Sequence, residues 1–206
     1  MNKNVLILAL ITLMFIAFST NCDAKKSILT TDEGVIINGI RWATRNVDAP
    51  GTFAANPEDA GMFYQWNRKK GWNITDREVE GWDNSIPAGT EWEAENDPCP
   101  EGWRAPTREE LQSLHSAVHI WATNWNDTGI NGFLFGVAPH LLFLPIAGCR
   151  NDEGTLHFAG NWGFYWSNTQ GHVTSWSWHL QINRGNTNVG IVSRASGFSV
   201  RCVAKN

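Results

Sequence analysis

The sequence predicts an α+β domain in which one or two helices pack on a mostly antiparallel sheet. Three features support this fold class: an Asn38-Gly39 pair between β-branched residues, a helix start at Thr107, and short apolar runs from Phe133 onward that glycine and asparagine interrupt. Such a pair is typical of a two-residue hairpin turn, and short apolar runs bounded by turn residues are typical of strands. No internal repeat is visible, and 206 residues suit one domain.

The helix start is a capping box, with Thr107 at the N-cap and Glu110 three residues later. The apolar residues that follow recur at helical spacing: Leu111, Leu114, Val118 and Trp121. We therefore expect a helix that continues to about Trp121 and buries one face.

Residues 57–98 are polar and irregular, and residues 76–97 hold eight acidic side chains against a single arginine. Runs of like charge are usually solvated. We therefore expect this stretch to be a loop excursion exposed to solvent.

The composition excludes several classes of protein. Hydrophobic residues make up 42% of the chain and charged residues 17%, with 12 Trp, 10 Phe and a formal net charge of −4. Disordered chains are poor in aromatic residues, and nucleic-acid-binding domains are usually basic. We therefore expect a globular domain with no nucleic-acid partner.

Residues 1–24 are predicted to be a secretory signal peptide. Lys3 precedes an apolar run over residues 5–18, which is too short to cross a bilayer as a helix but suits the core of a leader. Cleavage after Ala24 would leave residues 25–206 as a single domain. Alternatively, Cys22 is lipidated, which would give the protein its one contact with a membrane. Either route predicts an exported protein, secreted or held at the outer membrane or cell surface.

Three cysteines lie in the predicted domain: Cys99, Cys149 and Cys202. An odd number in an exported protein allows at most one bridge and leaves a free thiol, and the sequence alone leaves all three pairings open. No two of them have the spacing of a zinc site.

Acidic residues are absent after Glu153. Calcium needs anionic oxygen ligands and carboxylate acid–base catalysis needs Asp or Glu, so we predict no metal, no cofactor and no catalytic residue. The same stretch holds Trp and His among Asn, Ser, Thr and Gly, a composition typical of recognition surfaces.

The alternation of strand side chains divides residues 176–183 between two faces. The face toward the core is expected to hold Trp176, Trp178, Leu180 and Ile182. The residues between them are expected to face a ligand. The predicted ligand-binding residues are Trp162, Trp166, Asn168, Ser177, His179, Gln181, Asn183, Arg184, Asn186 and Asn188.

Four segments of the chain read GIRWATRNV, CPEGWRAPTREELQSL, LPIAGCRNDEGTLHFAGNWGFYWSNT and GFSVRCV. Together they resemble the Fibrobacter succinogenes major paralogous domain, which is common on exported proteins of Bacteroidetes and their relatives, and the likeness covers roughly residues 34–203. That family is similar to C-type-lectin-like folds. The resemblance therefore implies a C-type-lectin-like α+β domain, a Cys99–Cys202 disulfide and an unpaired Cys149.

The resemblance also implies surface display and binding, and it brings no catalytic residues. We expect a calcium-independent surface module, not an enzyme, that binds a protein or a glycan through its C-terminal strands and loops. Related folds are targets of diversity-generating retroelements, and residues 168–196 look like such a variable region. The alternatives are an adhesin or fimbrial-tip structural subunit and an enzyme of the formylglycine-generating type, although the latter needs a reactive pair of late cysteines and only Cys202 lies late.

Overall fold

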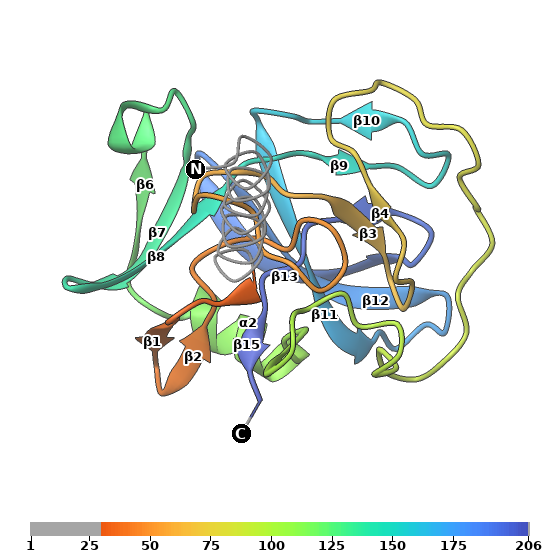
Figure 1. Cartoon of the computed structure of the whole chain (residues 1–206), viewed down its shortest axis with the longest axis horizontal. Coiled ribbons are helices and arrows are strands. Elements are labelled where there is room, and N and C mark those ends of the chain that lie inside the picture. The colour runs from red at the N-terminus through yellow and green to blue at the C-terminus, as the bar shows by residue number, and fades with distance from the viewer. Residues whose placement is uncertain (1–29, 206) are drawn as a thin grey trace, which may run out of the picture.

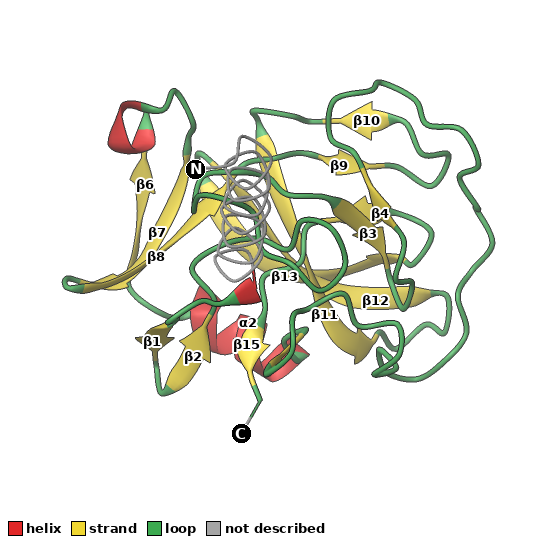
Figure 2. Cartoon of the chain, in the orientation of Figure 1, coloured by secondary structure: helices red, strands yellow, loops and turns green. Residues whose placement is uncertain are grey.

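The computed structural model describes residues 30–205 (Figure 1). In this range the chain forms fifteen short strands, one complete α-helix, α2 (Arg108–His115), and one 3₁₀ helix, η1 (Trp125–Asp127). Long loops connect the strands (Figure 2). The predicted signal peptide over residues 1–24, including Cys22, lies outside the described residues. None of the helices within residues 30–205 has the length and apolar character of a membrane span.

The strands form four small sheets with antiparallel neighbours. One sheet, β1-β2-β15-β5, joins Val35–Ile37, Ile40–Trp42, Val203–Ala204 and Trp103–Arg104. A second, β10-β9-β14-β3-β4, joins Leu156–His157, Cys149–Arg150, Gly197–Phe198, Phe63–Gln65 and Gly71–Trp72. A third, β6-β7-β8, joins His119–Ala122, Gly132–Val137 and His140–Pro145. The longest strands form β11-β12-β13, which joins Trp162–Gln170, Trp176–Asn183 and Asn186–Ser193.

The predicted α+β, C-type-lectin-like fold class is wrong, because the described chain is mostly antiparallel sheet and α2 has only 8 residues. The helix was expected to reach Trp121, but it ends at His115 and the following residues form strand β6. Ile120 pairs with Leu134 and Trp121 with Phe133 across the β6–β7 ladder. Helical spacing is a weak local preference, and this tertiary pairing overrides it.

The predicted capping box and the predicted hairpin turn are both confirmed. At the start of α2, the Thr107 hydroxyl accepts the Glu110 N–H and the Glu110 carboxylate accepts the Thr107 N–H, which completes the capping box. Asn38 and Gly39 have φ of 51° and 80° between β1 and β2, as a two-residue hairpin turn requires. Both signals depend on a few adjacent residues, so the sequence is sufficient to predict them.

Sheet β11-β12-β13 separates two apolar cores. Tyr165 and Leu180 belong to a core that contains Leu111 and Leu114 of α2. Trp166, the next residue along β11, points to the opposite side and joins a core rich in Trp and Phe. Successive strand residues face opposite sides, so this one sheet supplies side chains to both cores.

Two buried arginine side chains, Arg150 and Arg194, bind loop carbonyl groups rather than carboxylates. Arg150 is fully buried, and its guanidinium donates to the carbonyl oxygens of Asn73, Asp76 and Gly154 at 2.6–3.1 Å. Those carbonyls lie in loops and have no ladder partners, so the arginine supplies the hydrogen bonds that buried acceptors need.

Arg194 acts in the same way on another part of the β4–β5 connection. Its Nη1 donates to the carbonyl oxygens of Pro87 and Gly89, and its guanidinium lies 3.9 Å from the Trp66 ring. Tryptophan N–H groups also donate to backbone carbonyl oxygens: Trp66 to Ser167, Trp82 to Asp152, Trp92 to Asn96 and Trp166 to Tyr64. Trp82 and Trp92 therefore hold loop backbone in place, whereas Trp66 and Trp166 donate to residues of strands β11 and β3.

Residues 57–98 were predicted to form a solvent-exposed loop, and most of their acidic side chains are exposed as expected. Seven of the eight acidic side chains between residues 76 and 97 are exposed. Asp97 is partly buried and accepts the N–H groups of Cys99 and Ala105. The stretch also contains β3, whose three residues are buried, so it is not a simple surface loop.

The Cys99–Cys202 disulfide is confirmed, with 6.1 Å between the two Cα atoms. Cys149 is free and buried, and burial raises the pKa of its thiol to about 12. The thiol is therefore protonated and unreactive at neutral pH. No pair of free cysteines occurs within residues 30–205.

Replacing Arg150 with Met should destabilise the protein by about 3 kcal/mol, because the Met side chain fills similar space but leaves one buried and two partly buried carbonyl groups without a donor. Urea unfolding followed by tryptophan fluorescence measures this change. Arg184→Met, at an exposed turn, is the matched control and should change the unfolding free energy by less than about 0.5 kcal/mol. Equal unfolding midpoints for the two variants would contradict the role of Arg150.

Removing the disulfide in a Cys99→Ala/Cys202→Ala variant should lower the unfolding free energy by about 4–5 kcal/mol, since the bridged residues are 103 positions apart. Urea unfolding under oxidising conditions measures the loss. Cys149→Ala removes a buried thiol without opening a bridge and serves as the control. A loss no larger than that of the control would show that the bridge does not stabilise the fold.

Candidate functional site

The structure separates the predicted ligand-binding residues into three groups. One group lies at the β12–β13 turn end of sheet β11-β12-β13 and comprises Trp162, Gln181, Asn183, Arg184, Asn186 and Asn188. A second group, Trp166, Ser177 and His179, is buried. Asn168 lies toward the other end of β11, where its carbonyl accepts the Trp92 N–H.

The two faces predicted along β12 are observed, but the burial predicted for them is wrong at three positions. Ser177 is fully buried and His179 is 5% exposed, although both were expected to face a ligand, and Trp176 is 40% exposed although it was expected in the core. Other parts of the protein cover both faces of sheet β11-β12-β13, but the covered part of β12 differs between the two faces. Ser177 accepts a hydrogen bond from Arg194, and the His179 ring packs against Phe198.

On the opposite face, α2 packs over Leu180 and Ile182 and leaves the Trp176 end of β12 uncovered. Leu180 and Ile182 are fully buried, so their predicted place in the core is confirmed. Trp178, half-buried, lies between these regions with the Arg108 guanidinium 4.0 Å from its ring. Strand alternation alone could not show where this cover ends.

The first group shares one face of the sheet with aromatic residues. Across β11 and β12, Phe164 pairs with Gln181, and across β12 and β13, Gln181 pairs with Asn188. Directly paired residues point to the same side of a sheet. We call the surface formed by Phe158, Trp162, Phe164, Gln181 and Asn188 the aromatic–amide patch.

The aromatic part of the patch is a platform of three rings, of which two are nearly parallel and the third is inclined. The Trp162 and Phe164 rings are stacked, with centroids 6.1 Å apart and planes 13° apart. Phe158 lies 6.2 Å from each of them and is 53% exposed. The rear of Phe164 packs against Phe198 at 4.9 Å, so the core supports the platform.

A strained turn positions Phe158. This residue has a φ of +59°, a conformation that is unfavourable for a bulky side chain, and its carbonyl accepts the N–H groups of Asn161 and Trp162. Backbone strain of this kind persists only where the surrounding structure holds it, and it is concentrated at functional positions. The turn therefore presents an aromatic ring to solvent beside Trp162.

The polar part of the patch consists of amides. Asn188 is exposed, and its side chain has no hydrogen-bond partner among residues 30–205, so it is free to bind a ligand. Gln181 is half-buried beside Asn188 and hydrogen bonds to His179. Asn183 is engaged in the turn, since its Oδ1 accepts the N–H groups of Gly185 and Asn186.

The patch is electrically neutral. It contains no ionisable side chain, and burial lowers the pKa of the neighbouring His179 to about 4. Within the described part of the chain, no group of three or more His, Cys, Asp or Glu side chains is arranged to hold a metal ion. The chemistry available at the patch is therefore stacking and amide hydrogen bonding, which serves binding.

Sequence reasoning missed Phe158 and Phe164. Phe164 alternates with Trp162 and Trp166, so strand periodicity could have placed it on the face of Trp162. Phe158 carried no comparable signal, because its exposure depends on the left-handed backbone of the turn.

Comparisons with protein-family models, with curated proteins and with solved structures find no match to this chain. The resemblance to the Fibrobacter succinogenes major paralogous domain therefore stays a prediction from the four sequence segments.

The burial of His179 predicts a pH-dependent stability. The folded-state pKa lies below the unfolded value of about 6.5, so the unfolded chain takes up a proton first as the pH falls. Stability should be full above pH 6.5 and should decrease toward pH 4, where the loss reaches about 3 kcal/mol.

Urea unfolding of the protein and of a His179→Phe variant at pH 7, 5.5 and 4.5 isolates this contribution from that of other groups. The phenyl ring suits the aromatic surroundings and does not titrate. The difference in unfolding free energy between the two proteins should therefore move in favour of the variant as the pH falls. Parallel pH profiles would contradict the assignment.

Proposed function

We propose that this protein is an exported binding protein that holds a neutral glycan on the aromatic–amide patch. The observation that carries the proposal is an uncharged platform of aromatic rings beside the amide groups of Gln181 and Asn188, of which Asn188 has no hydrogen-bond partner within residues 30–205. Sugar rings present apolar C–H faces that pack on aromatic rings, and their hydroxyl groups both donate and accept hydrogen bonds, as the amides of Gln181 and Asn188 do.

The remaining predictions about the protein are consistent with this proposal. The leader pattern over residues 1–24 supports export, and a lipid on Cys22 would hold the module at the cell surface. The patch offers amides rather than carboxylates, so we propose that binding needs no calcium. The glycan is favoured over a protein partner because the patch combines aromatic rings with uncharged hydrogen-bonding groups.

Retroelement diversification remains part of the proposal as a genomic test. If residues 168–196 are a variable region, a near-copy of the corresponding coding sequence should lie beside a reverse-transcriptase gene and differ from it mainly at adenines. Absence of that copy would contradict the diversification hypothesis and would leave the glycan-binding proposal unaffected.

Screening the purified protein on an array of neutral oligosaccharides should identify binders, and Trp162→Ala should weaken the best of them by about 10-fold or more because it removes the centre of the platform. Asn188→Ala should weaken it less. Trp176→Ala is the matched control, since Trp176 is an exposed tryptophan on the opposite face of the same sheet.

Isothermal titration of the best binder, with and without EDTA, measures these effects. We expect EDTA to leave the affinity unchanged. Binding that survives Trp162→Ala but is lost in Trp176→Ala would place the ligand on the other face. Binding that EDTA abolishes would contradict calcium independence.

A further inference from the structure

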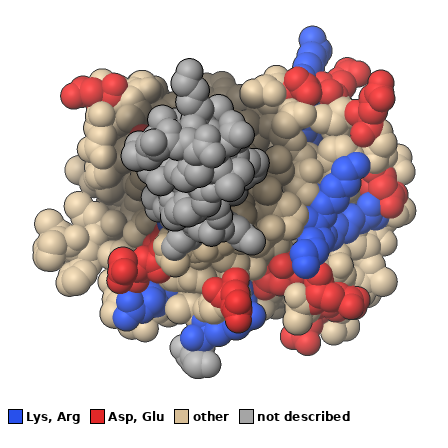
Figure 3. All heavy atoms as spheres, viewed as in Figure 1, with Lys and Arg blue, Asp and Glu red and all other residues tan. Residues whose placement is uncertain are grey.

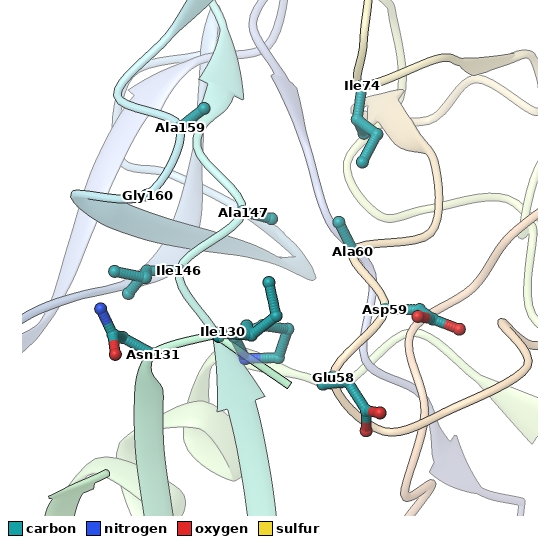
Figure 4. Close-up of a pocket in the computed structure, with 12 residues that line it drawn as sticks. Glu58, Asp59, Ala60, Ile74, Ile130, Asn131, Ile146, Ala147, Ala159 and Gly160 are labelled. Atoms are coloured by element: carbon teal, nitrogen blue, oxygen red, sulfur yellow. The ribbon is translucent and has the colours of Figure 1, made fainter. Parts of the chain in front are cut away.

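A concave surface lies between loops that are distant in sequence, next to the turn over residues 158–162. It is a cleft of about 370 Å³ that residues 58–60, 74, 129–131, 145–147 and 159–160 line. Figure 4 shows Ala60, Ile74, Ile130 and Ala147 pointing toward one common space. Ligand sites in proteins are typically mainly apolar cavities of about 300–1,000 Å³, and this cleft falls within that class.

Buried donors hold two of the cleft walls. Asn46 Nδ2 donates to the carbonyl oxygens of Asp59 and Ala60, and Asn46 Oδ1 accepts from the fully buried Arg201. Arg150 holds the carbonyl of Asn73, the residue before Ile74. The positions of these walls therefore depend on the core and not on a ligand.

The remaining walls are held by hydrogen bonds between loops. The Tyr165 hydroxyl donates to the carbonyl of Pro145, and the Ile146 N–H donates to the carbonyl of Asn131. The Gly160 N–H donates to the carbonyl of Ile146. Because every wall is tied to a neighbour, the cleft is already formed, and a ligand would pay little ordering entropy on entering it.

The charged side chains at the edge of the cleft are all acidic. Glu58 and Asp59 lie at the rim, with side chains that extend outward in Figure 4, and no Lys, Arg or His is among the lining residues. The Asp59 carboxylate accepts the backbone and side-chain N–H groups of Asn56, whereas the Glu58 carboxylate has no partner among residues 30–205. Such a rim disfavours an anionic ligand and favours a cation.

We propose that this cleft is a second ligand site that takes a compact apolar group bearing an ammonium head, such as an aryl-alkyl amine. The apolar group would contact Ile74, Ile130 and Ala147, and the ammonium would lie at the rim beside Glu58. The site is separate from the glycan proposal and does not depend on it. The turn over residues 158–162 contributes to both, since Ala159 and Gly160 line the cleft while Phe158 and Trp162 belong to the aromatic–amide patch.

Three probes with the same ring test the chemical class: 2-phenylethylamine, 2-phenylethanol and phenylacetate. Each is titrated into the purified protein at pH 7, and binding is followed by NMR chemical-shift changes. We expect the amine to bind best, the alcohol more weakly and the acid least. Phenylacetate binding as tight as that of the amine would overturn the assigned charge preference, and the absence of binding by the amine would overturn the site.

Two substitutions locate the site. Ala147→Leu extends a side chain into the cleft and should weaken binding of the amine by about 10-fold or more. Glu58→Gln keeps the shape and should weaken the amine by about 2–5-fold while leaving the alcohol unchanged, as expected for one exposed ion pair. Urea unfolding checks the fold of each variant, and Ile130→Ser, on an exposed loop, replaces Ala147→Leu if that variant is unstable.

The control variants keep this proposal distinct from glycan binding. Trp162→Ala should leave the affinity for the amine unchanged, and Glu109→Gln, an exposed carboxylate on α2, should do the same. Unchanged binding of the amine in folded Ala147→Leu or Ile130→Ser protein would overturn the proposal. Loss of glycan binding in Trp162→Ala, with the amine still bound, would show two independent sites.

Discussion

The structure depends on buried planar donors that satisfy loop carbonyl groups. Most of its strands are two or three residues long, so their ladders satisfy few backbone groups and the long loops must find other partners. Arg150 and Arg194 reach carbonyl oxygens in two loops, the β4–β5 connection and the β9–β10 connection, and the indoles of Trp82 and Trp92 donate to carbonyl oxygens in the same two loops. A guanidinium carries five donors in a rigid fork, which suits a site where several carbonyls converge. Backbone carbonyl dipoles, and not carboxylates, therefore face the positive charges of Arg150 and Arg194.

The same donors give the protein two preformed surfaces. Arg150 and Arg201 act on the walls of the cleft, directly or through Asn46, and the Trp166–Phe198 stack supports the platform beneath Phe164. Preformed surfaces bind with a smaller entropic cost than surfaces that must order on contact. Both proposed sites are shallow and offer a ligand few polar groups. Specific binding by so small a surface therefore depends on its rigidity. A loss of one buried arginine would loosen a site without touching its ligand.

Local signals predicted local structure, and tertiary packing decided the rest. The capping box at Thr107 and the Asn38-Gly39 turn depend on neighbouring residues, and both formed as expected. The helix failed beyond His115 because β7 offers β6 a partner that lies distant in sequence. Ser177 and His179 were misassigned for a related reason, since strand alternation identifies two faces but not which of them is covered. The roles of the buried arginines could not be read from sequence at all, because their partners are loop carbonyls with no side-chain signature.

These constraints limit where the proposed variable region could vary. Residues 168–196 include Ser177, His179 and Arg194, which are buried and join the sheet to the second core and to the loop of Gly89. A substitution at these positions would leave buried groups unsatisfied or open a cavity. Arg184, Asn186 and Asn188 are exposed around the β12–β13 turn and can change without such a cost. The fold therefore tolerates variation at the exposed residues 172–174 of the β11–β12 loop and at the β12–β13 turn beside Trp162. At the turn, variation would alter what the platform binds and leave the platform itself in place.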